Sequence, residues 1–555
     1  MTMTAIGRLA ERMAPLPPAT SRRVHVERGL KIPMDDGATL VADHWAPRDT
    51  GGRSLSEVPV VVVRTAYGRG GPLGWLYGPV LAERGLQVLM VSTRGTFGSD
   101  GEFLAMRNER ADGLATLRWL ADQSWSSGRV ILAGSSYFGY TQWAIADAAP
   151  PEVKAMVPHI TSSRLALSLT RPGRVDLETI TNFSWNTAPQ SHNGSPLPAA
   201  QEQRGYLLRS MVGADQRRIT NAMNTLPITD VDQAMLGRTS QFFQQIVNHD
   251  QNSTYWEDLD RSSTVPDVTV PVSSVTGWYD IFLADQLRDF TALVDAGREP
   301  RLTVGPWWHA DPRGMGASVT EVAEWASAVA TGQEPPHRAP VRLYVMGADE
   351  WRDFEAWPPA GYEPQRLYLR ADGTLTATAG AAEPPSAFTY DPGDPTPSLG
   401  GAKLTPAGAG PVDNRKLEER PDVLTFTGAP LTDHLEVIGE VTADIWVRAD
   451  RPSVDVFVRL CDVDPNGKSL NVCDDLVHLD VGDDTTCATV RLSPTAYRFK
   501  KGHRLRVQVS AGAFPRFARN LGGGEPVESA TALHKTNIEV FHDEAHPSAV
   551  GIPAR

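Results

Sequence analysis

A serine flanked by glycines follows a short apolar segment near the first quarter of the chain. The segment Val130-Ile-Leu-Ala133 is typical of a buried strand, and the apolar residues that follow Gly139 fit the start of a helix. A tight strand-to-helix turn would hold the Ser136 hydroxyl above the edge of a sheet, as in a nucleophile elbow. Gly134 and Gly139 lack Cβ atoms, so the backbone can close this turn. The Gly-x-Ser-x-x-Gly spacing is equally compatible with an ordinary glycine-rich turn.

Two further residues follow predicted strands in an order that suits nucleophilic catalysis. An activated serine needs a base to accept its proton and a carboxylate to orient that base, and in α/β-hydrolases the order along the chain is Ser, Asp, His. Asp280 comes after the apolar strand at 270–275, and His309 comes after the strand at 301–304. Taken alone, Asp280 could cap a helix and His309 could be structural. Their joint placement favours catalysis, with Ser136 as nucleophile.

Ser135 and His159 are the alternatives in the same part of the chain. Ser135 occupies the position before the elbow residue, where its side chain would point sideways. His159 also follows an apolar strand, at 153–158, but it precedes the candidate aspartate and comes soon after the elbow. The chain order therefore favours the first set of residues.

The pattern of apolar segments predicts the elements that position these residues. Residues 24–45 alternate as an antiparallel pair of strands. Apolar strands then alternate with segments of helical periodicity up to residue 160 and again over 268–340, which predicts a parallel sheet. The loops beyond the carboxyl ends of such strands form the working edge of the sheet, and both Tyr67 and Ser136 fall in these loops.

The pattern of apolar and polar residues changes at two points along the chain. Residues 161–267 lose the strand-helix alternation and contain polar helical stretches, at 204–212 and 239–249, which is typical of a helical cap over a site or, alternatively, of a separate partner-binding domain. From Val341-Arg-Leu-Tyr-Val onward, short alternating strands with Pro- and Gly-rich turns predict a β-sandwich, and 374–413 should be largely loop. The predicted fold class is α/β, with an α/β-hydrolase domain, an inserted helical cap and a C-terminal all-β jelly-roll domain. The predicted units are an N-terminal arm (1–23), the hydrolase domain in two parts (24–160 and 268–340), the cap (161–267) and the jelly roll (341–555).

The composition and charge of the chain exclude some classes of binding partner. A net charge of −13 with dispersed basic residues argues against nucleic acid or a membrane as partner. The N-terminal residues lack an apolar signal segment and no run reaches membrane-spanning length, so we expect a cytoplasmic protein. The three cysteines, Cys461, Cys473 and Cys487, support neither a disulfide framework nor a zinc site. A homodimer is compatible with the sequence.

Several segments combine glycine, aromatic and polar residues at characteristic spacing. They are Gly134–Trp143 around the elbow, Gly277-Trp-Tyr-Asp280, Gly305-Pro-Trp-Trp-His309, Arg64-Thr-Ala-Tyr67, Thr93-Arg-Gly95 with Ser99-Asp-Gly-Glu-Phe103, and Val345–Trp351. In these segments the chain resembles the cocaine esterase (CocE/NonD) hydrolase family, related to the X-Pro dipeptidyl-peptidases and the α-amino-acid ester hydrolases. The resemblance extends from about residue 24 to the C-terminus and is weakest in the cap.

The resemblance implies specific roles for site residues. Ser136 would be the nucleophile, His309 the general base and Asp280 its orienting acid. The Tyr67 hydroxyl and the Tyr137 backbone N–H would form the oxyanion hole, where hydrogen-bond donors stabilise charge that develops on the carbonyl oxygen. The C-terminal jelly roll would pack near this site.

The residues after the candidate aspartate predict the character of the pocket. The α-amino-acid ester hydrolases carry acidic residues there, whereas this chain has Ile281, Phe282 and Leu283. An apolar pocket favours an uncharged or aromatic acyl group, because burying an unpaired ammonium group is unfavourable. Phe282 matches an acyl-pocket phenylalanine of the family and is the candidate pocket wall, with core packing as the alternative.

The sequence therefore predicts a serine hydrolase that cleaves a small-molecule ester or amide through an acyl-enzyme, without metal or cofactor. An X-Pro dipeptidyl-peptidase-type aminopeptidase and an acyltransferase are the enzymatic alternatives. A non-catalytic ligand-binding protein is the alternative from another class. Labelling by a fluorophosphonate distinguishes the enzymes from a binding protein, which has no activated serine.

Overall fold

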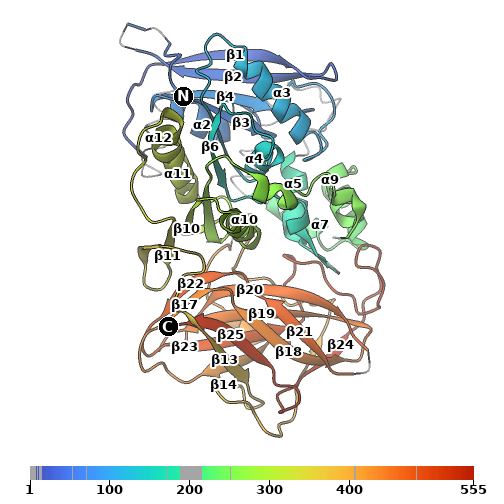
Figure 1. Ribbon diagram of the computed structural model, residues 1–555. Coiled ribbons are helices and arrows are strands. Elements are labelled where there is room, and N and C mark those ends of the chain that lie inside the picture. Colours follow the sequence, from blue (N-terminus) through green and yellow to red (C-terminus); the bar gives the residue numbers. More distant parts are fainter. Residues whose placement is uncertain are drawn as a thin grey trace.

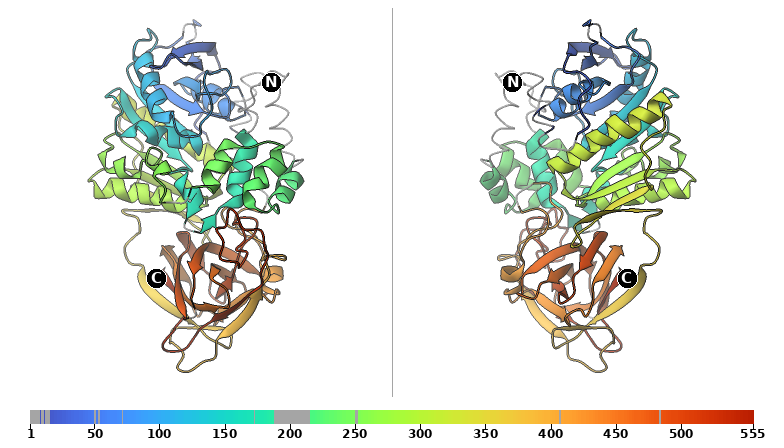
Figure 2. Two further views of the ribbon diagram at one scale, coloured as in Figure 1. Left: turned by 90° about the vertical axis from the view of Figure 1, so that its right-hand side faces the viewer. Right: turned by 90° about the vertical axis from the view of Figure 1, so that its left-hand side faces the viewer.

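The computed structural model describes residues 8, 11, 16–49, 51–52, 54–70, 72–171, 173–187, 215–249, 252–405, 408–482 and 484–555. This part of the chain forms two stacked units, one with a mixed sheet and packed helices and the other built almost entirely of strands (Figure 1). A group of shorter helices lies to one side of the junction between the two units (Figure 2). None of the described helices combines the length and the apolar composition needed to cross a lipid bilayer.

The first sheet has ten strands among the described residues. They are β1 (Val24–Pro33), β2 (Thr39–Pro47), β3 (Val60–Thr65), β4 (Gln87–Ser92), β5 (Val130–Ser135), β6 (Val153–His159), β9 (Ser273–Tyr279), β10 (Arg301–Trp308), β11 (Val341–Val345) and β12 (Glu350–Phe354). Their order across the sheet is β1-β2-β4-β3-β5-β6-β9-β10-β11-β12, and the strands from β4 to β11 run parallel. The predicted parallel sheet and the antiparallel pair at its start are confirmed.

Helices connect these strands and cover the sheet. They are α2 (Pro72–Ala82), α3 (Glu109–Ala121), α4 (Tyr137–Ala146), α10 (Leu283–Asp295), α11 (Pro312–Glu321) and α12 (Ser327–Thr331), with a π-helical segment at Val322–Ala326. Strand β5 has six buried residues and α4 is buried along its length, which explains why the sequence around the elbow is apolar on both sides.

The strand Val341–Val345 was predicted to begin the sandwich, and this prediction is wrong. The strand pairs in parallel with β10 and antiparallel with β12, so both β11 and β12 extend the first sheet. Its burial alternates because it lies next to the sheet edge, where the two faces are not equally covered. Such alternation does not distinguish an outer strand of an α/β sheet from a sandwich strand.

The chain between β6 and β9 is mainly helical where it is described. It contains α5 (Leu177–Thr187), α7 (Gln216–Ala222), α8 (Val231–Leu236) and α9 (Gln241–Val247), the two-stranded hairpin β7 (Thr170–Arg171) and β8 (Arg174–Val175), and 3₁₀ turns at Leu167–Leu169, Ile228–Asp230, Thr254–Trp256 and Ser262–Asp267. The helix predicted at 239–249 is present as α9, whereas the helix predicted at 204–212 and most of the predicted arm lie outside the described residues.

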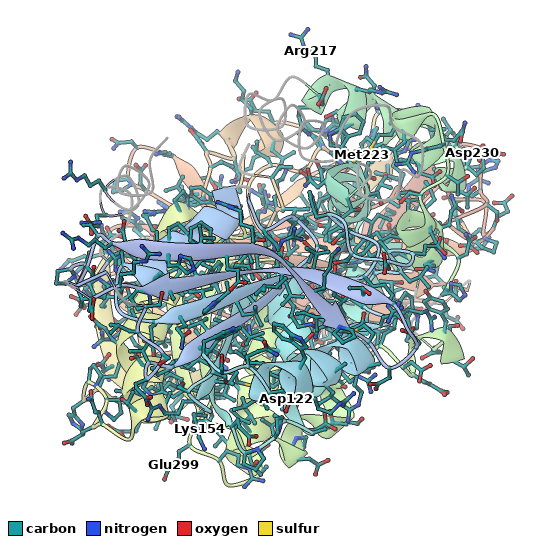
Figure 3. The ribbon with its side chains drawn as sticks, turned by 90° about the horizontal axis from the view of Figure 1, so that it is seen from above. Asp122, Lys154, Arg217, Met223, Asp230 and Glu299 are labelled. Atoms are coloured by element: carbon teal, nitrogen blue, oxygen red, sulfur yellow. The ribbon has the colours of Figure 1, made fainter. Side chains whose placement is uncertain are left out.

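A view down onto the first sheet shows on which side these helices lie (Figure 3). Asp122, Lys154 and Glu299, which stand near the amino ends of β5, β6 and β10, lie at one edge of the molecule. Arg217 of α7 and Asp230, which precedes α8, lie at the opposite edge. The inserted helices are therefore far from the amino ends of the parallel strands.

The C-terminal unit has a second sheet of thirteen strands among the described residues. They are β13 (Glu363–Leu369), β14 (Thr374–Thr376), β15 (Ser386–Tyr390), β16 (Leu424–Gly428), β17 (Leu435–Gly439), β18 (Thr442–Ala449), β19 (Ser453–Val463), β20 (Ser469–Asp480), β21 (Thr486–Arg491), β22 (Thr495–Phe499), β23 (Arg504–Ser510), β24 (Thr536–Val540) and β25 (Ala549–Ala554), with a short helix α13 (Arg415–Glu418). A β-rich C-terminal domain is confirmed. The segment 374–413 is mostly loop, as predicted, although β14 and β15 lie within it.

One hydrophobic core joins the two units. Trp278 and Tyr279, at the end of β9, belong to the same buried cluster as Val437 and Tyr497 of the second sheet. The Tyr279 hydroxyl also donates a hydrogen bond to the Asn471 carbonyl oxygen at 3.4 Å. The carboxyl end of β9 is thus packed directly against the C-terminal domain.

Candidate active site

The elbow predicted around Ser136 is present. Strand β5 ends at Ser135, α4 begins at Tyr137, and Ser136 between them has φ 56° and ψ −121°, a conformation that non-glycine residues rarely adopt. Gly134 has φ 145°, and a Cβ there would lie 2.5 Å from the Phe138 Cβ. The turn therefore requires glycine at this position, as the sequence pattern predicted.

The backbone of Ser136 is tied to the end of the neighbouring strand β6. The Ser136 N–H donates a hydrogen bond to the His159 carbonyl oxygen at 2.8 Å. The Ser136 carbonyl oxygen accepts a hydrogen bond from the Thr161 hydroxyl at 2.8 Å. Gly139 allows this approach, because a Cβ at that residue would lie 2.4 Å from the Thr161 side chain. The nucleophile candidate is thus held through backbone contacts, which leaves its hydroxyl available for a different partner.

That partner is His309. Its Nε2 lies 3.0 Å from Ser136 Oγ, and its Nδ1 lies 2.7 Å from Asp280 Oδ2. The other carboxylate oxygen of Asp280 accepts the Phe282 N–H at 2.8 Å. With a proton on Nδ1, the ring donates to Asp280 and can accept the serine proton at Nε2, which is the arrangement needed to activate a serine.

The rival residues point elsewhere. Ser135 is buried, and its Oγ lies 3.4 Å from the Met315 sulfur and 3.3 Å from the Tyr77 hydroxyl. The His159 ring is also buried, and the burial, together with the nearby His309, lowers its pKa to about 3. His159 therefore stays neutral and contributes its backbone carbonyl, rather than its ring, to the contact with Ser136.

Tyr67 and Tyr137, the two predicted oxyanion donors, lie next to each other. Their ring centroids are 6.5 Å apart in an edge-to-face arrangement. The Tyr137 N–H is the first of α4, where backbone donors have no partner within the helix. Burial raises the pKa of the Tyr67 phenol, so its hydroxyl keeps its proton and can donate. The two predicted donors therefore come from different parts of the fold, the loop after β3 and the first residue of α4.

Aromatic side chains border this group. The Phe282 ring lies edge-to-face with His309 at a centroid distance of 5.4 Å and is almost completely buried, so it contacts both the site and the core. Phe183 on α5 lies 6.4 Å from the Tyr67 ring and 6.3 Å from the Tyr137 ring. No periodic or spacing signal placed Phe183 at the site, because its position depends on how the inserted helices fold.

A buried charged pair behind the elbow was also missed from the sequence. Arg64, at the end of the apolar run of β3, pairs with Glu109 at the start of α3. A charged residue at the end of an apolar strand signals that a buried partner exists, but it does not name the partner. Among the described residues, no three His, Cys, Asp or Glu side chains are grouped so that they could hold a metal ion.

Comparisons with known proteins agree with this arrangement. The X-Pro dipeptidyl-peptidase (S15) family matches residues 36–311, and the C-terminal non-catalytic domain of X-Pro dipeptidyl-peptidases matches residues 337–551. The chain is 30% identical to a cocaine esterase from Rhodococcus sp. (strain MB1 Bresler), over 95% of this chain and 98% of that protein.

Solved structures show the same fold at lower sequence identity. An aminopeptidase from a marine sediment archaeon, Thaumarchaeota archaeon, superimposes with a TM-score of 0.80 at 20% identity and covers 97% of both chains. An α-amino acid ester hydrolase superimposes with a TM-score of 0.79 at 20% identity and covers 97% of this chain and 98% of its own.

The fold and the site together define a serine hydrolase of the α/β-hydrolase type with a C-terminal β-rich domain. Its class is that of serine esterases and related hydrolases. The chain belongs to the cocaine esterase (CocE/NonD) hydrolase family.

Proposed function

We propose that this serine hydrolase cleaves carboxylic esters of small, uncharged or aromatic acids through an acyl-enzyme on Ser136. The observation that carries the proposal is the hydrogen-bonded chain from Ser136 Oγ through the His309 ring to Asp280, with distances of 3.0 and 2.7 Å. Such a chain converts a weakly nucleophilic hydroxyl into one that can attack a carbonyl carbon.

Each group has one task in the proposed reaction. Ser136 Oγ attacks the ester carbonyl carbon as His309 Nε2 accepts the hydroxyl proton, and Asp280 stabilises the imidazolium that forms. The Tyr67 hydroxyl and the Tyr137 N–H donate to the oxyanion. The tetrahedral intermediate collapses when His309 protonates the leaving alcohol. Water, deprotonated by His309, then hydrolyses the acyl-enzyme and releases the acid.

The proposed acyl preference rests on the side chains beside the triad. Phe282 packs against the His309 ring, and Ile281 packs against the same hydrophobic core. An apolar surface accepts a benzoyl or acetyl group but gives no partner to an α-ammonium group, which would lose its hydration without compensation. We therefore place amino-acid esters below neutral esters as substrates.

The test is hydrolysis of p-nitrophenyl acetate and p-nitrophenyl benzoate by the wild type, Ser136→Ala and Ser135→Ala. We expect Ser136→Ala to lose turnover and fluorophosphonate labelling while it stays folded. Ser135→Ala, which removes a neighbouring hydroxyl of the same strand end, should retain both. Retained turnover and labelling in Ser136→Ala would refute the assignment of the nucleophile.

Peptidase activity is the second candidate, because the matched family over residues 36–311 is that of X-Pro dipeptidyl-peptidases. A dipeptidyl p-nitroanilide with proline at its second position, assayed beside the esters, separates the two. We expect a much smaller kcat/KM for the anilide, since the residues after Asp280 carry no acidic partner for the substrate's amino terminus.

A further inference from the structure

A buried polar network lies directly behind the elbow. The Tyr137 hydroxyl donates to Glu109 Oε1 at 2.7 Å and accepts the Met106 N–H at 2.9 Å. Arg64 binds the other carboxylate oxygen of Glu109 and also donates to the Glu109 backbone carbonyl at 2.7 Å. One glutamate thus connects a residue at the end of β3 to the first residue of α4.

The network is enclosed by protein on all sides. Arg64, Glu109 and Tyr137 are almost completely buried. Burial raises the pKa of Glu109, although the adjacent Arg64 lowers it in part. Gly113 makes room for the guanidinium, because a Cβ there would lie 2.3 Å from Arg64 Nη1. A buried charge needs hydrogen-bonded partners, and Arg64 and Tyr137 both bind the Glu109 carboxylate, so each member has little freedom to move.

One candidate oxyanion donor, Tyr137, belongs to this network, and the other, Tyr67, follows one of its members in the chain. Tyr137 supplies its backbone N–H to the hole and its phenol to Glu109, so the network holds the same residue from the opposite end. Tyr67 follows Arg64 by three residues in the loop after β3, and its N–H donates to Thr65 Oγ1 at 3.0 Å. Glu109 therefore connects the end of β3, which leads into the loop that carries Tyr67, to Tyr137 at the start of α4.

We propose that Glu109 and the Tyr137 hydroxyl are positioning residues, which set the separation of the Tyr67 and Tyr137 donors of the oxyanion hole. The inference rests on the proposed function of these donors. A donor displaced by a fraction of an ångström still binds a ground-state ester, but it stabilises the oxyanion less well. Loss of the network should therefore lower kcat and leave KM unchanged.

The experiment compares Tyr137→Phe with Tyr140→Phe. Tyr140 lies one turn along the same helix, is equally buried, and donates to the Leu259 carbonyl oxygen at 2.8 Å, so its substitution also removes a buried hydrogen bond of a tyrosine hydroxyl. We expect Tyr137→Phe to lower kcat about 10- to 100-fold on p-nitrophenyl acetate with unchanged KM. Inhibition by phenylboronic acid, which forms a tetrahedral adduct with an active serine, should weaken by a similar factor.

Tyr140→Phe should lose similar thermal stability and keep its kcat. Equal kcat values for the two variants would overturn the proposal, because only a general effect of a lost buried hydrogen bond would remain. Should Tyr137→Phe fail to fold, Glu109→Gln serves as the second variant, for which we expect the same fall in kcat at constant KM.

A double-mutant cycle adds a readout that a purely structural role would not change. If the Tyr137 hydroxyl acts through the oxyanion hole, the kcat losses of Tyr67→Phe and Tyr137→Phe will not add, because each disables the same hole. Additive losses would contradict the proposal. Failure of the proposed function is recognised separately, by turnover and fluorophosphonate labelling that persist in Ser136→Ala.

Discussion

The two sides of the site are supported by different parts of the protein. On the elbow side, Ser136 is held by backbone and side-chain hydrogen bonds from the end of β6, within the first sheet. On the other side, α5 carries Phe183 against Tyr67 and Tyr137, and the start of α5 is held by the C-terminal domain. Ser136 is thus held within the first sheet, whereas α5 is held by the neighbouring inserted helices and by contacts with the C-terminal domain.

The contacts of β8 and of the start of α5 with the C-terminal domain are concentrated on a few residues. Arg174 forms a buried ion pair with Asp475, donates to the Leu476 carbonyl oxygen at 2.9 Å and lies over the Phe517 ring. The Ala518 N–H donates to the Val175 carbonyl oxygen at 2.9 Å. Glu178, in the first turn of α5, accepts a hydrogen bond from the Thr405 hydroxyl at 3.1 Å. Its other carboxylate oxygen lies 3.5 Å from the Lys403 ammonium nitrogen.

This difference separates two kinds of substitution effect. Damage to the elbow side should reduce the rate of the chemical step, because it acts on groups that contact the reacting atoms. Damage to the α5 anchor should reduce stability and substrate binding, because it loosens one wall of the site and leaves the serine and its base in place. The first three predictions below test this separation, from the largest effect to the smaller ones.

Asp280→Asn should lower kcat about 10⁴-fold, because an amide in place of the orienting carboxylate favours the wrong imidazole tautomer for proton transfer from the serine. The buried site keeps its shape, so the free energy of unfolding should change little. Steady-state kinetics on p-nitrophenyl acetate and urea-induced unfolding measure both quantities. Asp295→Asn at the exposed end of α10 is the matched control. A kcat equal to that of this control would remove Asp280 from the proposed mechanism.

Arg174→Gln should have the opposite effect: it should lower stability and substrate binding and leave kcat almost unchanged. The substitution removes the buried ion pair between Arg174 and Asp475, and loss of such a pair destabilises a protein by about 3–5 kcal/mol. We expect urea unfolding at a clearly lower midpoint, a raised KM for the benzoyl ester, and a kcat close to that of the wild type.

The exposed pair of Arg448 and Glu539 in the second sheet provides the comparison. Arg448→Gln should cost less than about 1 kcal/mol, since solvent already screens this pair. If Arg174→Gln lowers kcat as much as Asp280→Asn does, the two sides of the site are not separable.

Tyr67→Phe concerns the elbow side again and removes one of the two proposed oxyanion donors. Loss of a single donor costs about 10²- to 10³-fold in kcat in comparable sites, and the substitution leaves the ring contacts with Phe138 and Phe183 in place. KM and the unfolding midpoint should therefore stay near the wild-type values. An unchanged kcat would show that the Tyr67 hydroxyl does not contribute to the hole.

The sequence was sufficient for those features that depend on local pattern and chain order. The strand and helix around Ser136, the parallel sheet, and the placement of Asp280 and His309 after successive strands all follow from apolar runs and their spacing. The geometry of a parallel sheet then brings the loops at the carboxyl ends together, so residues far apart in the chain could be assigned to one site.

The remaining features depend on pairing between distant segments, which a single sequence does not reveal. Arg64 and Glu109 meet because the first residue of α3 lies beside the end of β3, and neither residue has a pattern that selects the other. Phe183 lies beside Tyr67 and Tyr137 because α5 packs with the other inserted helices, where the Phe183 ring contacts Phe242, and because its first turn contacts the C-terminal domain. The strand Val341–Val345 was misassigned because its alternation fits both an outer sheet strand and a sandwich.

The last prediction uses pH to separate the two sides. Burial, with a smaller effect from His309, lowers the pKa of His159 to about 3, below its ordinary value of 6.5. Between about pH 3 and pH 6.5, the His159 imidazole is therefore protonated in the unfolded chain and neutral in the folded chain. This contribution to stability is present above pH 6.5 and is lost as pH falls toward 3, by about 2 kcal/mol between pH 7 and pH 5.

Urea unfolding of the wild type, His159→Gln and Arg174→Gln at pH 7, 6 and 5 tests this assignment. His44, whose pKa burial lowers to about 4, adds a similar loss in all three proteins. His159→Gln should therefore lose less stability than the wild type over this range. Arg174→Gln leaves the surroundings of the His159 ring unchanged, so this variant should keep the part of the loss that His159 causes. Parallel losses in wild type and His159→Gln would show that His159, beside the elbow, is not the group that makes the fold sensitive to acid.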